Sequence, residues 1–118
     1  MSTRGHAADL TPVCRLDQIE VEGGVAALVD GVAVAIFRTH DGNVYAMSNW
    51  DPFSNASVLS RGIVGTRGDV PFVASPMYKQ AFDLRTGQCL DDAAIQIPVH
   101  DVRVVDGTVL VGSRRGNL

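Results

Sequence analysis

The chain has 118 residues, of which 46% are hydrophobic and 19% charged, a size and composition typical of one domain with one core. The formal net charge is −3, with both signs dispersed along the sequence. This pattern excludes the basic face of a nucleic-acid-binding protein and the cationic cluster of a membrane-surface protein. No segment approaches the roughly 18 consecutive apolar residues of a membrane span.

The ends of the chain predict neither export nor a second domain. Residues 1–11 hold one arginine and one histidine but no apolar stretch of the kind a secretory signal needs. We expect flexible tails at residues 1–11 and 114–118 and one domain at residues 12–113. Cys14 and Cys89 are far apart in the sequence, so we expect reduced core thiols in a cytoplasmic protein.

The first half of the domain is predicted to form strands after a turn or short helix at Asp17–Val21. Three consecutive strands are expected at Gly24–Val29, Val32–Thr39 and Asn43–Ser48, because the Asp-Gly pairs between them are hairpin signals. The middle strand has little polar interruption, which indicates burial on both faces.

The second half begins with a predicted turn or short helix at Asn55–Ser60, followed by glycines at residues 62–68 that indicate turns. A strand pair is expected at Val70–Ala74 and Gln80–Leu84. The chain then ends in a hairpin, with strands at 99–105 and 108–111 around one more Asp-Gly pair.

No window of the sequence keeps an apolar 3.6-residue period for more than about two turns. Many short strands separated by glycine turns are typical of an antiparallel β-sandwich or a small barrel. We therefore predict an all-β fold.

The segment from Ser75 to Gly87 has the spacing of the second half of a Rieske iron–sulfur site, C-P-x-H-G-x-x-F-D-L-x-T-G. The cysteine and histidine of that pattern are cluster ligands. Ser75 and Tyr78 stand in their places here, and Lys79 stands at the place of the glycine. The segment thus keeps the frame of the motif without its ligands.

An upstream segment resembles the first half of the same site, N-x-C-P-H-x. Asp51 stands at the cysteine place and Phe53 at the histidine place. A shifted register would put Pro52 and Ser54 there instead, and neither register restores a ligand set. A Rieske cluster needs two thiolates and two imidazoles, so we expect no metal, no cofactor and no catalytic residue in this chain.

Two uses of the ligand-free loops stay open. In one, Phe53 and Tyr78 are core side chains that fill the space of the cluster, since each ring can bury on the order of 150–250 Å². In the other, an exposed tip docks onto another protein, because aromatic and Met side chains anchor interfaces. The residues of that possible interface are Trp50, Phe53, Met77, Tyr78 and Lys79.

Three segments together resemble the small subunit of assimilatory NAD(P)H-dependent nitrite reductase. They are Asp51–Ser54, Val58–Gly65, and Ser75-Pro76 with Lys79, Phe82 and Leu84. The resemblance implies a Rieske-like domain without cluster ligands. It also implies a large-subunit partner that carries FAD, an iron–sulfur cluster and sirohaem and reduces nitrite to ammonium with NADH or NADPH.

On this resemblance, the chain is an accessory subunit that stabilises the large subunit or docks onto it. Two alternatives remain. One is a free-standing binding or regulatory module with no reductase partner. The other is an electron-transfer ferredoxin of the Rieske type, which would be a brown protein that contains iron and sulfide.

Overall fold

A computed structural model describes residues 10–115 of the chain. The strands are β1 Thr11–Arg15, β2 Gly23–Val29, β3 Val32–Arg38, β4 Val44–Ser48, β5 Trp50–Asp51, β6 Ala56–Ser57, β7 Ile63–Arg67, β8 Val70–Ala74, β9 Ala81–Asp83, β10 Val99–Val105 and β11 Thr108–Arg115. Two short 3-10 helices, η2 Leu16–Gln18 and η3 Leu59–Arg61, connect some of them. The all-β prediction is confirmed.

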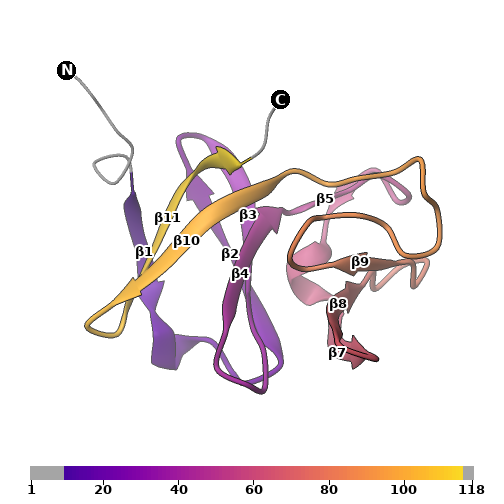
Figure 1. The fold of residues 1–118 in the computed structure, drawn as a ribbon. Helices are drawn as coiled ribbons and strands as arrows, with labels where there is room; N and C mark the ends of the chain where they lie inside the picture. Colours follow the sequence, from indigo (N-terminus) through magenta and orange to yellow (C-terminus); the bar gives the residue numbers. More distant parts are fainter. Residues whose placement is uncertain (1–9, 116–118) are drawn as a thin grey trace.

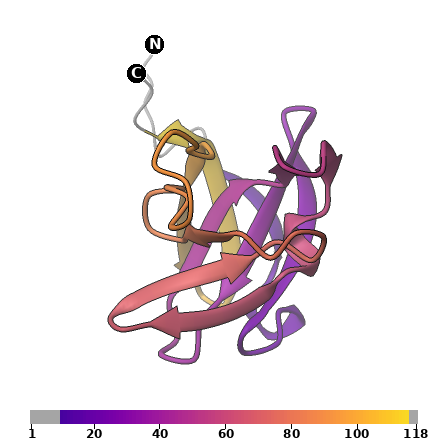
Figure 2. The same cartoon turned by 90° about the vertical axis from the view of Figure 1, so that its right-hand side faces the viewer.

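The largest sheet has six antiparallel strands in the order β1-β11-β10-β4-β3-β2. Its two edge strands, β1 and β2, contact each other, so the sheet forms an almost closed barrel (Figure 1). A three-stranded sheet, β7-β8-β9, and a small β5-β6 hairpin complete the fold. Figure 2 shows the three-stranded sheet lying across one side of the barrel. Both halves of the Rieske-like motif belong to this smaller part of the fold.

The two faces of β3 pack into two different hydrophobic cores. Val34 and Ile36 belong to the cluster that also includes Val109 of β11. Ala35 and Phe37 belong to a second cluster, which includes side chains of the three-stranded sheet. All four side chains are fully buried. The prediction that this strand is buried on both faces is therefore confirmed.

Six of the seven predicted strands begin and end within one residue of the observed strands. The last strand is longer than predicted, because Arg114 and Arg115 pair with His100 and Val99 of β10. β11 thus includes the first two residues of the tail predicted at 114–118. The rest of that tail, residues 116–118, and residues 1–9 of the N-terminal tail lie outside the described residues.

Of the glycines predicted to lie in turns between residues 62 and 68, Gly65 does not. Gly68 does lie in a turn, with a φ of +64°, but Gly65 lies inside β7. Gly65 pairs with Phe72 of β8, and a Cβ at Gly65 would lie 2.9 Å from the phenyl ring. An aromatic side chain that covers a glycine on the neighbouring strand is a known way to stabilise such a pair.

The turn or short helix predicted at 17–21 is present as η2, which begins one residue earlier. The segment expected at 55–60 holds β6 before the short helix η3. The sequence analysis missed β1, whose register with β11 is irregular between Pro12 and Cys14. Five residues that include a proline give little alternating pattern, and only pairing with β11 makes this segment a strand.

Gly87 closes the loop after β9 and is the last residue of the Rieske-like motif. Its φ is +81°, and a Cβ at this position would lie 1.8 Å from the Ile97 carbonyl oxygen. The Gly87 N–H donates to the Asp83 carbonyl oxygen at 2.7 Å, and its own oxygen accepts from the Ile97 N–H at 2.8 Å. The loop therefore requires glycine for conformation and for space.

We expect Gly87→Ala to lower the free energy of unfolding by about 3 kcal/mol or more, because it adds a backbone clash to positive-φ strain. Gly42→Ala is the matched control, since Gly42 has a φ of +89° with nothing within 4 Å of the added Cβ. That control should lose only about 1 kcal/mol. Urea denaturation measures both, and equal losses would contradict the close approach at Gly87.

Candidate functional site

Asp51 and Ser75, which the motif spacing predicts at the two cysteine places, are joined by a hydrogen bond. Asp51 ends β5 and Ser75 follows β8, so the two residues come from different sheets. The Ser75 hydroxyl donates to Asp51 Oδ2. Both residues are buried, with 0% and 1% of their surface exposed. A buried polar contact therefore connects the two loops, between residues that the motif spacing predicts at ligand places.

Two further donors satisfy the buried Asp51 carboxylate. The Phe53 backbone N–H donates to Oδ1 at 2.9 Å, and the Ser54 hydroxyl donates to Oδ2 at 2.8 Å. This is an Asx turn, which the Asp51-Pro52 dipeptide favours and which the sequence analysis missed. In the alternative register, Pro52 and Ser54 hold the ligand places; both are half-buried, and Ser54 serves as a donor to Asp51.

Ser75 also organises the loop that follows it. Its hydroxyl oxygen accepts from the Met77 N–H at 3.2 Å, and its carbonyl oxygen accepts from the Lys79 N–H at 3.0 Å. The Ser75 N–H donates to the Gln80 carbonyl oxygen at 2.9 Å. Lys79, which stands at the glycine place of the motif, has a φ of +65°. This is a left-handed conformation that glycine adopts readily.

The aromatic side chains at the two histidine places have different environments. Phe53 is half-buried and packs against the core, with its ring centroid 6.1 Å from that of Phe82. Tyr78 is 59% exposed. Of the two alternatives, Tyr78 therefore fits the exposed tip and not a core side chain, whereas Phe53 packs on the core.

The other residues predicted for an interface are exposed. Met77 is 59% exposed and Trp50 is 46% exposed. Lys79, two residues after Met77, is also exposed. Trp50 precedes Asp51 in the sequence, while Met77, Tyr78 and Lys79 lie two to four residues after Ser75. We refer to Trp50, Met77, Tyr78 and Lys79 as the tip surface.

The residues at the four ligand places do not fit a [2Fe-2S] cluster, because they offer neither a thiolate nor an imidazole. The two cysteines lie elsewhere, Cys14 on β1 and Cys89 in the core between the two sheets. Burial raises the pKa of the Cys14 thiol, which disfavours the thiolate form. Within residues 10–115, no group of three or more His, Cys, Asp or Glu could hold a metal ion.

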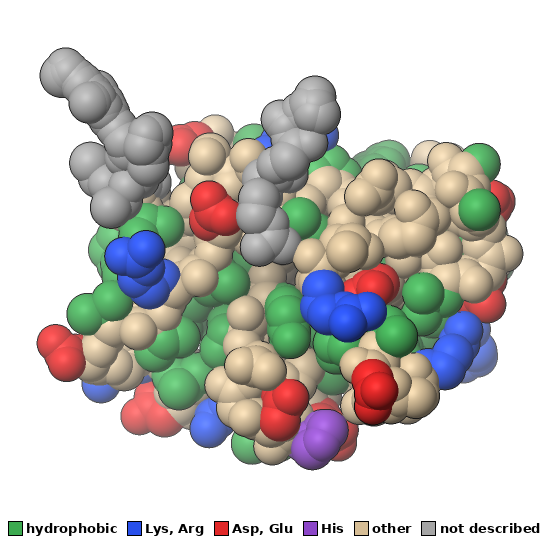
Figure 3. All heavy atoms as spheres, viewed as in Figure 1, with side chains coloured by type: hydrophobic (Ala, Val, Ile, Leu, Met, Phe, Trp, Pro, Cys, Tyr) green, Lys and Arg blue, Asp and Glu red, His purple; other side chains and the backbone are tan. Residues whose placement is uncertain are grey.

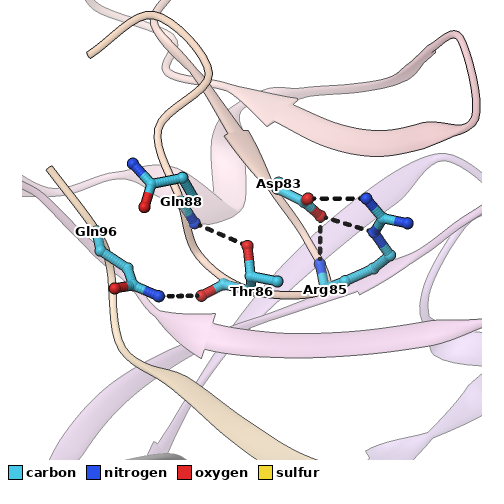
Figure 4. A network of polar contacts seen from close by, with 5 residues as sticks. All are labelled: Asp83, Arg85, Thr86, Gln88 and Gln96. Atoms are coloured by element: carbon cyan, nitrogen blue, oxygen red, sulfur yellow. Dashed lines mark hydrogen bonds and ion pairs between the residues drawn. The ribbon is translucent and has the colours of Figure 1, made fainter. Parts of the chain in front are cut away.

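An ion pair supports the segment between β9 and Gly87 (Figure 4). The Arg85 guanidinium donates to both oxygens of Asp83, each at 3.0 Å, and the Arg85 backbone N–H donates to Oδ1 at 2.9 Å. Next along the chain, Thr86 accepts hydrogen bonds from Gln88 and Gln96. The turn that ends the motif is thus stabilised by the Asp83–Arg85 pair before it and by the hydrogen bonds of Gln88 and Gln96 after it.

The Asp83 carboxyl is shifted toward its charged form. Burial raises its pKa, but the hydrogen bonds and positive charge of Arg85 outweigh this effect, so the pKa lies below its ordinary value. The Asp83 side chain is 9% exposed and that of Arg85 is 48% exposed. Solvent therefore screens the pair from one side only.

The surface gives no sign of a nucleic-acid or membrane site on the side that Figure 3 shows. Acidic and basic side chains are interspersed there, and apolar side chains lie between them. In the part of the chain that the structure describes, no helix has the length and apolar character that crossing a membrane requires.

The barrel, the smaller sheet and the two joined loops define a Rieske-like domain. The chain belongs to the family described as the Rieske-like [2Fe-2S] domain, which matches residues 9–112. Within this family it is a nitrite reductase small subunit, which is a subunit of an oxidoreductase. It is 46% identical over 98 residues to the nitrite reductase (NADH) small subunit of Salmonella typhimurium, which covers 82% of this chain and 91% of that one.

A second relative is larger than this chain. The nitrite reductase [NAD(P)H] large subunit of Klebsiella oxytoca is 40% identical over 103 residues, which are 87% of this chain and 11% of that protein. A domain similar to this chain therefore lies within a large-subunit polypeptide there.

Solved structures agree with this assignment. The NMR structure of the Escherichia coli protein NirD superposes with a TM-score of 0.80 at 41% identity, over 92% of this chain and 97% of that one. The ferredoxin of carbazole 1,9a-dioxygenase from Nocardioides aromaticivorans has a TM-score of 0.75 at 29% identity, over 87% and 96%. The recognition of the family from the sequence is confirmed.

We expect Ser75→Ala to lower the free energy of unfolding by about 1–3 kcal/mol, because it leaves the buried Asp51 carboxylate without one of its donors. Ser57→Ala is the control, since Ser57 is an exposed strand residue of the neighbouring hairpin. Urea denaturation measures the difference. A Ser75 variant as stable as the control would show that the loops do not depend on this bond.

We expect Asp83→Asn to lower the free energy of unfolding by about 1 kcal/mol at pH 7, because Arg85 loses a charged acceptor but stays partly solvated. The pKa of Asp83 is lower in the folded state than in the unfolded state. The charged carboxylate therefore stabilises the fold fully above the unfolded pKa of about 3.9, and this stabilisation is lost as the pH falls through the lower, folded pKa. The two proteins should therefore converge in stability below about pH 4.

Denaturation curves between pH 3 and pH 7 measure this convergence. Asp17→Asn is the control, since Asp17 is exposed in η2. A constant difference between wild type and Asp83→Asn across this range would contradict the role of the charge.

Proposed function

We propose that this chain is the accessory small subunit of a cytoplasmic NAD(P)H-dependent nitrite reductase and that it acts by docking onto the large subunit and stabilising it. The observation that carries this proposal is the buried hydrogen bond between Asp51 and Ser75. It keeps the two loops of a Rieske-like domain together without groups that can ligate iron. A scaffold of this kind is suited to binding a partner.

The electron relay belongs, on this proposal, to the large subunit. Reduction of nitrite to ammonium takes six electrons, and the resemblance implies FAD, an iron–sulfur cluster and sirohaem on the large subunit to carry them from NADH or NADPH. This chain contributes no ligand set within residues 10–115. The domain within the Klebsiella oxytoca large subunit supports a direct association between the two kinds of chain.

The tip surface is the proposed contact. Trp50, Met77 and Tyr78 each expose about half of their surface, and buried aromatic and Met side chains dominate the energy of many interfaces. Lys79 adds a charge at the rim. Phe53 is half-buried and packs on Phe82 of the core, which positions the first loop.

An electron-transfer ferredoxin is the alternative that the fold itself favours, because the carbazole dioxygenase ferredoxin is a structural neighbour. A free-standing binding module is the other. The donor set at the four ligand places argues against the ferredoxin, since a carboxylate, a phenyl ring, a hydroxyl and a phenol cannot replace two thiolates and two imidazoles.

Co-expression with the large subunit, followed by size-exclusion chromatography, tests the proposal. We expect one complex that contains both chains, and a large subunit that loses stability or cofactor when expressed alone. Iron and sulfide bound to the small subunit alone would support the ferredoxin instead. Failure of the chains to associate, with a fully stable and active large subunit, would leave the free-standing module.

Variants of the tip surface locate the contact. We expect the triple variant Trp50→Ala, Met77→Ala and Tyr78→Ala to bind the large subunit at least about thirtyfold more weakly, because the loss of even one interface anchor costs about 2 kcal/mol or more. Leu28→Ala is the control, since Leu28 is 72% exposed on β2 and outside the tip surface. Equal affinities for the two variants would exclude this surface.

A further inference from the structure

The barrel opens where β4 and β10 separate. These strands pair only at Met47 with Val99 and at Ala46 with His100, although β4 has five residues and β10 has seven. The β10–β11 register is irregular just after His100, between His100 and Val102. Figure 1 shows β4 and β10 meeting at one end and diverging from there. We refer to this opening between the two strands as the fork.

A cleft of about 220 Å³ lies at the fork. Val44, Tyr45 and Ala46 of β4 line it from one side, and His100 and Val102 of β10 line it from the other. Leu84 and Arg85, from the end of the Rieske-like motif, complete the lining. Pockets for drug-sized ligands and cofactors occupy about 300–1,000 Å³. The fork is therefore too small for a flavin or a nicotinamide and has room for one side chain of a partner.

The edge of β4 at the fork offers unpaired backbone groups. The Ser48 N–H donates to the Pro98 carbonyl oxygen at 2.9 Å, and the Asn49 N–H donates to the Ala33 carbonyl oxygen at 3.0 Å on the opposite side. Along an antiparallel strand, the N–H and C=O groups of successive residues point to opposite sides. Val44 is four residues before Ser48, so its N–H and C=O point to the same side as those of Ser48, which is the side of the fork. The β4–β10 pairing stops before Val44. An open strand edge of this kind is a template for one more strand.

His100 adds a chemical preference to this edge. The residue is 5% exposed, and its Nδ1 lies 2.9 Å from the Gly112 carbonyl oxygen. A carbonyl oxygen only accepts, so Nδ1 carries the proton and Nε2 of the neutral ring is an acceptor. Nε2 is buried and has no hydrogen-bond partner within the described residues. Buried polar atoms are normally paired, so a donor at this position would be favoured.

We propose that the fork binds an extended segment of the nitrite reductase large subunit, which adds to the β4 edge at Val44 and brings a hydroxyl or amide side chain to His100 Nε2. This inference rests on the proposed function. The partner is the large subunit because the Klebsiella oxytoca relative carries a similar domain within that polypeptide. The segment is extended because a strand edge pairs with extended backbone.

Hydrogen exchange of the ¹⁵N-labelled chain, alone and bound to the intact large subunit, tests the backbone contact. We expect the Val44 amide to exchange at least tenfold more slowly in the complex. The Ala27 amide on β2, at the far end of the sheet order, is the control and should not change. Slow exchange of Val44 in the chain alone at high concentration would instead assign the fork to a second copy and overturn the proposal.

The variant His100→Asn tests the side-chain contact. An asparagine amide can still donate to the Gly112 carbonyl oxygen, but it has no atom at the place of Nε2. We expect the variant to bind the large subunit roughly three- to tenfold more weakly, as the loss of one hydrogen bond predicts. His40→Asn is the control, since His40 is an exposed histidine outside the fork.

The outcomes separate this inference from the proposed function. A complex that forms without protection of Val44, and that tolerates His100→Asn, would overturn the fork while leaving the accessory subunit in place. If no complex forms at all, both proposals fail. Protection of Val44 together with weaker binding of His100→Asn would support the fork as a second contact beside the tip surface.

Discussion

The hydrogen bond between Ser75 and Asp51 connects the two loops of the Rieske-like motif directly. The first loop rests on a hairpin with two residues in each strand, and the second is a short turn between β8 and β9. In a Rieske protein the cluster would cross-link these loops through four ligands. Here a buried hydroxyl–carboxylate contact does so, supported by the Phe53 N–H and the Ser54 hydroxyl. The conformation of both loops depends on this small polar cluster.

The segment from Ser75 to Gly87 links the proposed contact surfaces to the core. Its first residues carry most of the tip surface, and Leu84 and Arg85 line the fork. Between them, Phe82 and Leu84 are anchored in the core, and Asp83 fixes Arg85. Residues of this segment other than those at the ligand places therefore contribute to the core and to both proposed contact surfaces.

The sequence predicts those parts of the fold that depend on local signals. The Asp-Gly hairpins and the apolar β3 identify half of the barrel, and the motif spacing identifies the family. β7 escapes prediction because Gly65 is tolerated only through the ring of Phe72 on the next strand, a contact between residues seven apart. β1 depends on pairing with β11 at the other end of the chain. Such contacts are set by tertiary structure and leave little local pattern.

The ligand places could be identified from sequence, but their contacts could not. Spacing predicts Ser75 at one cysteine place and Asp51, or Pro52 in the shifted register, at the other. Only the fold shows that Asp51 and Ser75 bond to each other and that Tyr78 is exposed. A double-mutant cycle with Asp51→Ala, Ser75→Ala and the double variant tests this central contact most directly. We predict a coupling energy of about 1–3 kcal/mol in urea denaturation. Additive losses, with no coupling, would contradict the account.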